Sequence, residues 1–397
     1  MDARLTESQP TKMRQATKVF IDNSGLLVLG TVMALVWANV DREGYVRLSH
    51  SLHFIVNDVA MAFFFALATK EVVEATAPGG VLHSPRRAAL PLAAAVGGML
   101  GPALIFLGLT IVMDRPNLER GWAIACATDI AFSYLAARLI FGAKHPAIPF
   151  LLLLAIADDA LGLLIIAAFY PSGPLRVVEL GVGLSAAVMA GWFLNKRGTL
   201  SFWPYIFTAG ILSWLALHRG GLHPALALVP IVPFLPHASR DRGLFVNSLS
   251  AHDTLTEFEH WFKRPVDVML FFFGLVNAGV TFGNVGAGTW FVLIAILIGK
   301  PVGILTATAA AALAGLRLPA SVTWRDLIVV GIIAGIGFTV ALFFATAAFP
   351  YGRLLDETKM GALLSFSAFA FALAAARLLG VGRFARIASR GSRVVSR

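Results

Sequence analysis

Two adjacent aspartates, Asp158 and Asp159, stand near the middle of an otherwise apolar stretch, residues 150–170. About twenty such residues cross a bilayer core as a helix. A carboxylate at the centre of that helix costs about 2.5–3.5 kcal/mol on insertion scales, and two neighbouring carboxylates also repel each other. Helix packing needs no such pair, so the pair predicts a functional site. The alternative is a short surface turn, although no turn residue appears before Gly162.

Two more polar sites lie inside apolar stretches. Thr128 and Asp129, within residues 122–140, offer hydroxyl and carboxylate oxygens, which suit a hard cation or the cap of a broken helix. Lys300, within residues 289–313, must pair with an acid, lose its proton or extend to the membrane interface. The intramembrane aspartates favour pairing, and extension to the interface is the alternative.

Glycines interrupt a further apolar stretch, residues 327–349. Gly331, Gly335 and Gly337 weaken a helix there, and Thr339 follows them. Helix breaks persist in a membrane where the freed backbone lines a cavity or meets protein. Close packing of helices through small residues is an equal alternative.

Composition identifies an integral membrane protein. Hydrophobic residues make up 58% of the 397 residues and charged residues 14%, whereas a soluble chain carries about 25% charge. The pattern predicts an all-α polytopic protein with about twelve transmembrane segments. These segments lie at approximately residues 24–40, 57–68, 88–112, 122–140, 148–170, 177–194, 202–217, 224–236, 266–280, 289–313, 327–349 and 361–379.

The basic residues follow this topology. With a cytoplasmic N-terminus, most of the 32 Lys and Arg fall on the cytoplasmic side. The net charge of +10 therefore reflects topology, and we expect no nucleic-acid partner. One cysteine, Cys126, excludes an intramolecular disulfide.

We expect a single membrane domain over residues 1–397, with both termini cytoplasmic: an N-terminal segment 1–18 and a basic tail 383–397. Segments three to five (88–170) and ten to twelve (289–379) each have an interrupted middle member, and the two triplets enter from opposite sides. Such inverted repeats place two broken, crossing helices and a substrate site at the bilayer midplane. Asp129 would offset the positive helix ends there, and Lys300 the negative ends.

These features resemble the NhaA family of bacterial sodium/proton antiporters over nearly the whole chain. The matching motifs are Gly121-Trp-Ala-Ile, Ala127-Thr128-Asp129-Ile-Ala-Phe132, Ala157-Asp158-Asp159, Asn277-Ala-Gly-Val280, Ile298-Gly299-Lys300-Pro301 and Gly335-Ile-Gly-Phe-Thr339. The resemblance implies a secondary active transporter of the bacterial inner membrane, not an enzyme, that exports Na⁺ or Li⁺ in exchange for H⁺ and serves pH homeostasis. It implies no cofactor, and it suggests a homodimer.

The resemblance also implies roles for single residues. Asp159 is the expected main carboxylate for Na⁺ and protons, and Asp158 is its partner, which pairs with Lys300 in one state. Thr128 completes the expected Na⁺ ligands with the two aspartates. Asp129, Gly335, Gly337 and Thr339 support the crossing of the broken helices.

A set of four residues falls where the family places its pH response, which we interpret as a cytoplasmic funnel: Asp58, Glu71, His223 and Glu259. A solvated rim is the alternative for the acids, and an interfacial side chain for His223. The chain departs from the family pattern at Ala125-Cys126, where Pro-Ala is usual, and around Glu71, where Lys70 is displaced. These departures put the pH response in doubt and leave the expected transport site intact.

Other functions compete with antiport. An intramembrane aspartyl protease also needs two membrane aspartates, but from separate helices and with a Gly-x-Gly-Asp motif that this chain lacks. A proton-coupled transporter of another small solute, such as an organic anion recognised by Lys300, is a nearer alternative. A channel is disfavoured because a buried ion pair makes a poor open pore, and a sensor without transport activity remains open.

Overall fold

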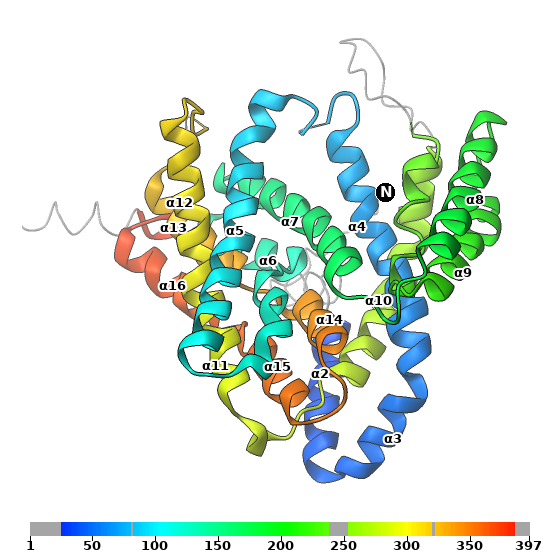
Figure 1. Cartoon of the computed structure of the whole chain (residues 1–397). Coiled ribbons are helices and arrows are strands. Elements are labelled where there is room, and N and C mark those ends of the chain that lie inside the picture. The colour runs from blue at the N-terminus through cyan, green and yellow to red at the C-terminus, as the bar shows by residue number, and fades with distance from the viewer. Residues whose placement is uncertain (1–24, 81, 238–252, 320–321, 386–397) are drawn as a thin grey trace, which may run out of the picture.

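A computed structural model describes residues 25–80, 82–237, 253–319 and 322–385. Every regular element in these ranges is helical (Figure 1). The expected N-terminal segment 1–18 lies outside the described residues. Of the expected basic tail, only residues 383–385 are described.

The helices, with short 3-10 and π-helical segments labelled η, follow one another along the chain. They are α2 (Gly25–Val40), α3 (Arg42–His53), η1 (Phe54–Ala60), α4 (Met61–Thr76), α5 (Pro85–Val112), η2 (Pro116–Cys126), α6 (Ile130–Phe141), α7 (Ala147–Phe169), α8 (Val177–Lys196), η3 (Tyr205–Gly210), α9 (Ile211–Gly220), η4 (Pro224–Leu226), η5 (Val232–Phe234), α10 (Thr254–Asn277), η6 (Phe282–Asn284), α11 (Ala287–Ile294), η7 (Ala295–Gly299), α12 (Lys300–Leu313), α13 (Trp324–Ala334), α14 (Phe338–Ala348), α15 (Arg353–Leu364), α16 (Ser367–Leu379) and η8 (Gly382–Phe384).

Several of these helices are suited to cross a membrane. Six are long and apolar enough, and two bent pairs raise the number to eight within the ranges described above. The pair η2 and α6 bends by 56°, and the pair α13 and α14 bends by 48°. These pairs occupy the predicted fourth and eleventh segments, so the all-α polytopic fold with two broken helices is confirmed.

One predicted segment, residues 224–236, is not a helix of membrane-spanning length. It contains only the two short segments η4 and η5, of three residues each. Pro224, Pro230, Pro233 and Pro236 punctuate it. Proline lacks the backbone N–H and clashes with the preceding turn, so a continuous helix cannot form there. The prediction of a transmembrane segment here was wrong because it considered only the apolar composition.

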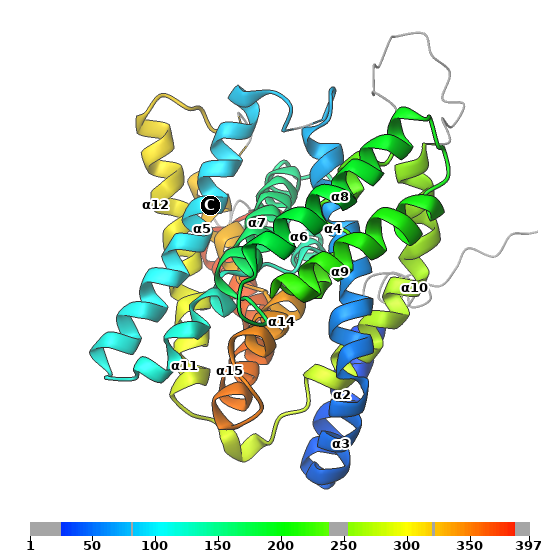
Figure 2. The same cartoon turned by 45° about the vertical axis from the view of Figure 1, so that its right-hand side comes forward.

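The helices expected to form inverted repeats run in opposite directions. In Figures 1 and 2, α5 passes from the upper to the lower end of the molecule, whereas α11 and α12 pass from the lower to the upper end. The helices α5 and α12 pack against each other. Their antiparallel course is the arrangement expected of inverted-topology repeats.

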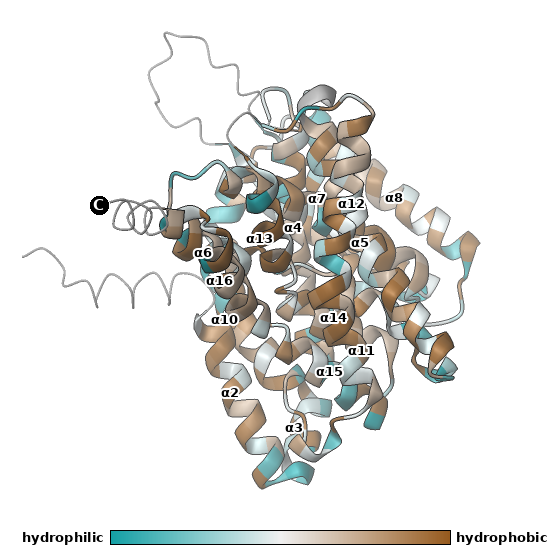
Figure 3. Cartoon of the chain, turned by 90° about the vertical axis from the view of Figure 1, so that its left-hand side faces the viewer, coloured by the Kyte–Doolittle hydropathy of each residue, from teal (hydrophilic) through white to brown (hydrophobic). Residues whose placement is uncertain are grey.

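Hydrophobic residues predominate along most of the helices, as Figure 3 shows. Large hydrophobic side chains there remain exposed, among them Leu104 on α5, Val182 on α8 and Leu313 on α12. Water would make so many exposed apolar side chains costly, whereas lipid tails cover them without penalty. The arrangement is that of a multi-pass membrane protein.

Glycines bring α5 and α12 together beside Lys300. A side chain on Gly303 would lie 2.0 Å from the carbonyl oxygen of Gly97, and one on Gly101 would lie 2.2 Å from that of Gly299. Only glycine permits this approach of two backbones. The contact fixes the start of α12 and therefore the position of Lys300.

Gly303→Ala tests this contact. The added methyl group has no space against the Gly97 backbone, so the helices must separate. We expect the free energy of unfolding to fall by about 1–3 kcal/mol, the usual range for overpacking, which thermal unfolding in detergent measures. Gly108→Ala, on α5 where nothing lies within 4 Å of an added methyl group, should leave the midpoint unchanged or slightly raised. Equal midpoints for both variants would contradict the proposed packing.

Candidate functional site

Two helix breaks meet in the interior of the molecule. The helical backbone stops after Cys126 and resumes at Ile130, and it stops after Ala334 and resumes at Phe338. A side chain on Gly337 would lie 2.6 Å from the carbonyl oxygen of Ala127, in the other break. The sequence left open whether the glycines break their helix or allow it to pack closely against another. The structure shows both, because the helix breaks after Ala334 and its backbone also packs closely against the other break.

Hydrogen bonds join the two breaks. The backbone N–H of Asp129 donates to the carbonyl oxygen of Ile336 at 2.6 Å. The hydroxyl of Thr128 donates to the carbonyl oxygen of Ala334 at 2.9 Å. Backbone groups released by one break are thus satisfied by the other, as an apolar surrounding requires.

Asp129 caps two half-helices at once. One carboxylate oxygen accepts from the backbone N–H of Phe132 at 3.3 Å, at the start of α6. The other accepts from the backbone N–H of Thr339 at 3.2 Å and from the Thr339 hydroxyl, at the start of α14. The positive ends of both half-helices therefore face one negative side chain.

Lys300 lies at the opposite kind of helix end. Its ammonium group is fully buried and donates to the carbonyl oxygen of Cys126, the last residue of η2. It also donates to Oδ2 of Asp158 at 2.8 Å. The only cysteine of the chain thus contributes its backbone oxygen, and its side chain donates to the carbonyl oxygen of Met99 at 3.3 Å.

Asp158 is buried and only half satisfied. Its Oδ2 accepts from Lys300 and also from the Thr128 hydroxyl, at 2.5 Å, so that this oxygen and the carbonyl oxygen of Ala334 share the single hydroxyl proton. Its Oδ1 is buried and has no hydrogen-bond partner among the described residues. The Oδ1 oxygen of Asp158 is therefore available to a proton or a cation.

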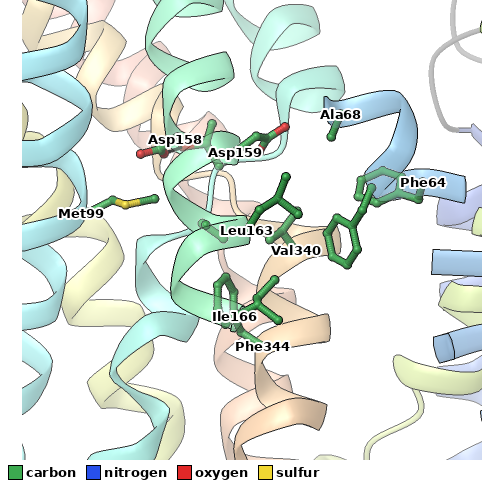
Figure 4. Close-up of a pocket in the computed structure, with 13 residues that line it drawn as sticks. Phe64, Ala68, Met99, Asp158, Asp159, Leu163, Ile166, Val340 and Phe344 are labelled. Atoms are coloured by element: carbon green, nitrogen blue, oxygen red, sulfur yellow. Dashed lines mark hydrogen bonds between the residues drawn. The ribbon is translucent and has the colours of Figure 1, made fainter. Parts of the chain in front are cut away.

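Asp159 has a different environment from its neighbour. Figure 4 shows the two carboxylates pointing to different sides of α7. Asp159 makes no hydrogen bond or ion pair with the part of the protein that the structure describes. Its side chain lines both a narrow pocket of about 10 Å³ and a wider cavity of about 350 Å³. Thr128 lines both spaces as well.

The wider cavity, which we call the funnel, is rich in acids. Its charged lining residues are Glu71, Asp129, Asp159, Glu259, Lys263 and Asp267. Lys263 and Asp267 did not emerge from the sequence. Lys263 follows Glu259 by four residues and Asp267 follows Lys263 by four, and this spacing could have placed all three on one helix face.

A second cavity of about 650 Å³ lies at the other end of the site and contains Asp58 and His223. Asp58 and Glu71 lie 13 residues apart (71 − 58) along one continuous helix, Arg42–Thr76, or about 20 Å at 1.5 Å per residue. The grouping of all four predicted residues in one funnel is therefore corrected. Glu71 and Glu259 share the funnel, whereas Asp58 and His223 face each other at 3.7 Å in the second cavity.

Aromatic rings separate the two cavities. Phe65 contacts Phe343 edge to face, with ring centroids 5.0 Å apart, and Tyr170 contacts Phe344 at 5.5 Å. Phe344 also lines the narrow pocket beside Asp159. The carboxylate site is thus open toward the funnel and closed toward the second cavity.

The displaced Lys70 has a structural role at the funnel. Its ammonium group is nearly buried and lies 2.5 Å from Glu259, 2.9 Å from Glu74 and 3.4 Å from Glu71. These contacts join α4 to α10. Lys70 has no role that could be predicted from the sequence, because its partner on α10 is remote in the chain.

Comparison with solved structures identifies the fold. The structure of MjNhaP1, a sodium proton antiporter from Methanocaldococcus jannaschii, matches with a TM-score of 0.55 and covers 93% of this chain and 95% of that one. Sequence identity is 14%, so this likeness concerns the fold alone.

Sequence comparison is more specific. The chain is 47% identical over 364 residues to the Na(+)/H(+) antiporter NhaA of Desulfitobacterium hafniense, which covers 89% of this chain and 94% of the relative. It is 46% identical over 380 residues to that of Geobacter metallireducens, covering 94% and 100%. The family described as Na+/H+ antiporter 1 matches residues 16–378. The chain belongs to this Na⁺/H⁺ antiporter family.

Proposed function

We propose that this chain exchanges Na⁺ for protons across the membrane and that Asp158 and Asp159 form the shared binding site. One observation carries the proposal. A carboxylate without a protein partner in the described residues, Asp159, lies at the inner end of the acidic funnel beside the buried pair of Asp158 and Lys300.

Competition for the same oxygens couples the two ions. A hard cation such as Na⁺ prefers carboxylate, hydroxyl and carbonyl oxygens, and Asp158, Asp159 and Thr128 supply them. A proton occupies a carboxylate oxygen that the cation would otherwise use. The two aspartates lie next to each other and titrate as a coupled pair. Asp158 exchanges its bond to Lys300 for a bond to the cation.

Alternating access then carries one ion or the other across. The repeats 88–170 and 289–379 form the bundle that holds the site, and it moves against the helices α2–α4 and α8–α10. The aromatic layer of Phe343 and Phe344 closes one side while the funnel is open. If more than one proton moves per cation, exchange is electrogenic.

Topology and ion range complete the proposal. The distribution of Lys and Arg supports a cytoplasmic position for both termini. In this orientation the funnel opens to the cytoplasm of a bacterial cell, and the protein lies in its inner membrane. Li⁺, a smaller hard cation, is a second substrate. The protein works as a homodimer and contributes to pH homeostasis.

Asp159→Asn tests the site. The amide keeps the shape of the carboxylate but neither binds a proton in the relevant range nor attracts Na⁺. We expect Na⁺-dependent and Li⁺-dependent proton movement in everted vesicles to fall to background across pH 6–9, while the protein still inserts. Dequenching of a pH-sensitive dye after addition of Na⁺, Li⁺ or K⁺ measures it.

Asp114→Asn is the matched control for this variant. Asp114 is exposed, and its positive φ of 49° suits asparagine. Exchange in that variant should equal the wild type. Wild-type exchange in Asp159→Asn would remove Asp159 from the site, and no cation-dependent signal from the wild type would refute the proposed function.

A double-mutant cycle tests the pairing of Lys300. Lys300→Met leaves the Asp158 carboxylate buried without its cation, which typically costs about 3–5 kcal/mol. Adding Asp158→Asn removes that unpaired charge, so we expect the double variant to regain part of the lost thermal stability. Thermal midpoints in detergent measure both steps. Additive losses in the double variant would show that the two side chains do not interact.

A further inference from the structure

An apolar groove of about 380 Å³ lies between α2, α6 and α16. It shares no lining residue with the funnel, the narrow pocket or the second cavity. All of its lining side chains are apolar: Val28, Phe132, Leu135, Ala136, Leu139, Ile336, Phe366 and Phe369. A polar ligand would find no hydrogen-bond partner among these side chains, whereas a hydrocarbon chain loses nothing there.

The groove runs from the helix crossing to the end of α6. At its inner end, the backbone N–H of Phe132 and the carbonyl oxygen of Ile336 both bond to Asp129. At its outer end, Leu139 lies in the last turn of α6 and is 49% exposed. Seven residues (139 − 132), or about 10 Å of helix, separate Phe132 from Leu139. One leaflet of the bilayer core is about 15 Å deep, so the groove fits within a single leaflet.

Three arginines gather at the outer end of the groove. Arg138 directly precedes Leu139 on α6. Arg383, on η8, donates to the carbonyl oxygen of Arg138 at 3.2 Å. Arg377, in the last turn of α16, lies over the ring of Phe384 at 5.4 Å from its centroid. The elements α6, α16 and η8 pack against one another, and α6 and α16 lie together on one side of the molecule (Figure 3).

These three guanidinium groups lack an acidic partner. Arg377 and Arg383 are exposed and Arg138 is half-buried. None of them forms an ion pair with a carboxylate of the described residues, where the paired arginines are Arg42, Arg176 and Arg353. Arginine binds phosphate through paired N–H donors, and basic pockets between membrane helices bind anionic headgroups. The positive charge therefore complements a phosphate at the same end at which the groove opens.

We propose that an anionic phospholipid binds here, with one acyl chain in the groove and its phosphate on Arg138, Arg377 and Arg383. In the orientation proposed above, this lipid comes from the cytoplasmic leaflet. Val28 belongs to α2, whereas the other lining residues belong to the two repeats, so the acyl chain joins α2 to the bundle that holds the carboxylate site. The inference does not depend on the proposed Na⁺/H⁺ exchange.

The double variant Arg138→Gln with Arg383→Gln tests the headgroup site. The purified full-length chain in detergent is titrated with phosphatidylglycerol, and native mass spectrometry counts the bound lipid. We expect the wild type to retain the lipid and to unfold at a higher temperature with it. The Kd of the double variant should rise about tenfold or more, because each basic side chain near the membrane surface attracts the headgroup. Replacing both arginines with lysine should restore much of the affinity.

Leu139→Trp tests the groove. Leu139 is half exposed, so the larger ring fills the outer end of the groove without entering the core. The affinity for phosphatidylglycerol should fall although all three arginines remain. Phosphatidylcholine with the same acyl chains should bind the wild type more weakly, because its headgroup has no net charge. Glycerol phosphate, which has the phosphate but no acyl chain, should not displace the bound lipid.

Arg317→Gln is the matched control for the loss of charge. Arg317 is exposed, follows α12 and does not line the groove. Its affinity for phosphatidylglycerol should equal that of the wild type, and equal unfolding midpoints without lipid show that all variants fold. Equal affinities of the wild type and the double variant would overturn the proposal. Equal binding of phosphatidylcholine, or displacement by glycerol phosphate, would overturn it as well.

Discussion

The site depends on a helix crossing that an apolar membrane would forbid without compensation. Two helices break at the same depth, and each break leaves backbone groups and partial charges that lipid cannot satisfy. Asp129 accepts from the start of two half-helices, and Lys300 donates to the end of a third. Opposite charges at opposite helix ends therefore hold the crossing together, and the carboxylates on α7 acquire their environments from it.

This constraint gives the two aspartates different tasks. Lys300 is committed to a helix end, and the same ammonium group reaches Asp158. Asp158 is consequently half neutralised, whereas Asp159 faces the funnel without a protein partner in the described residues. The two carboxylates of α7 thus form a coupled site in which Asp158 is paired with Lys300 and Asp159 is available to an ion. A peptidase would need its two aspartates on facing helices, an arrangement that a pair adjacent in sequence cannot provide.

The sequence predicts those features that are determined by the free-energy cost of placing a charge in the membrane. A charge within an apolar stretch must have a partner, so the pairing of Lys300 with an aspartate could be anticipated from composition. The position of a side chain along a helix, and the side of the helix on which it lies, carry no such free-energy cost. Asp58 and Glu71 were therefore grouped although they face different cavities, and Asp267 was overlooked because its cavity is formed by remote segments. The predicted helix at 224–236 failed for another reason, since hydropathy ignored four prolines.

The two cavities differ in the charge of their lining residues, and this difference affects cation binding but not the direction of transport. Carboxylates predominate in the funnel, whereas the second cavity adds Arg176, Arg219 and three histidines to a single acid, Asp58. A cation meets an attractive field on one side and a weaker or opposing field on the other. A fixed electrostatic field cannot drive net transport, because a cation gains and loses the same electrostatic energy whichever way it crosses. It sets the cation concentration at which each face of the carrier is half occupied, and the ion gradients alone decide the direction of exchange.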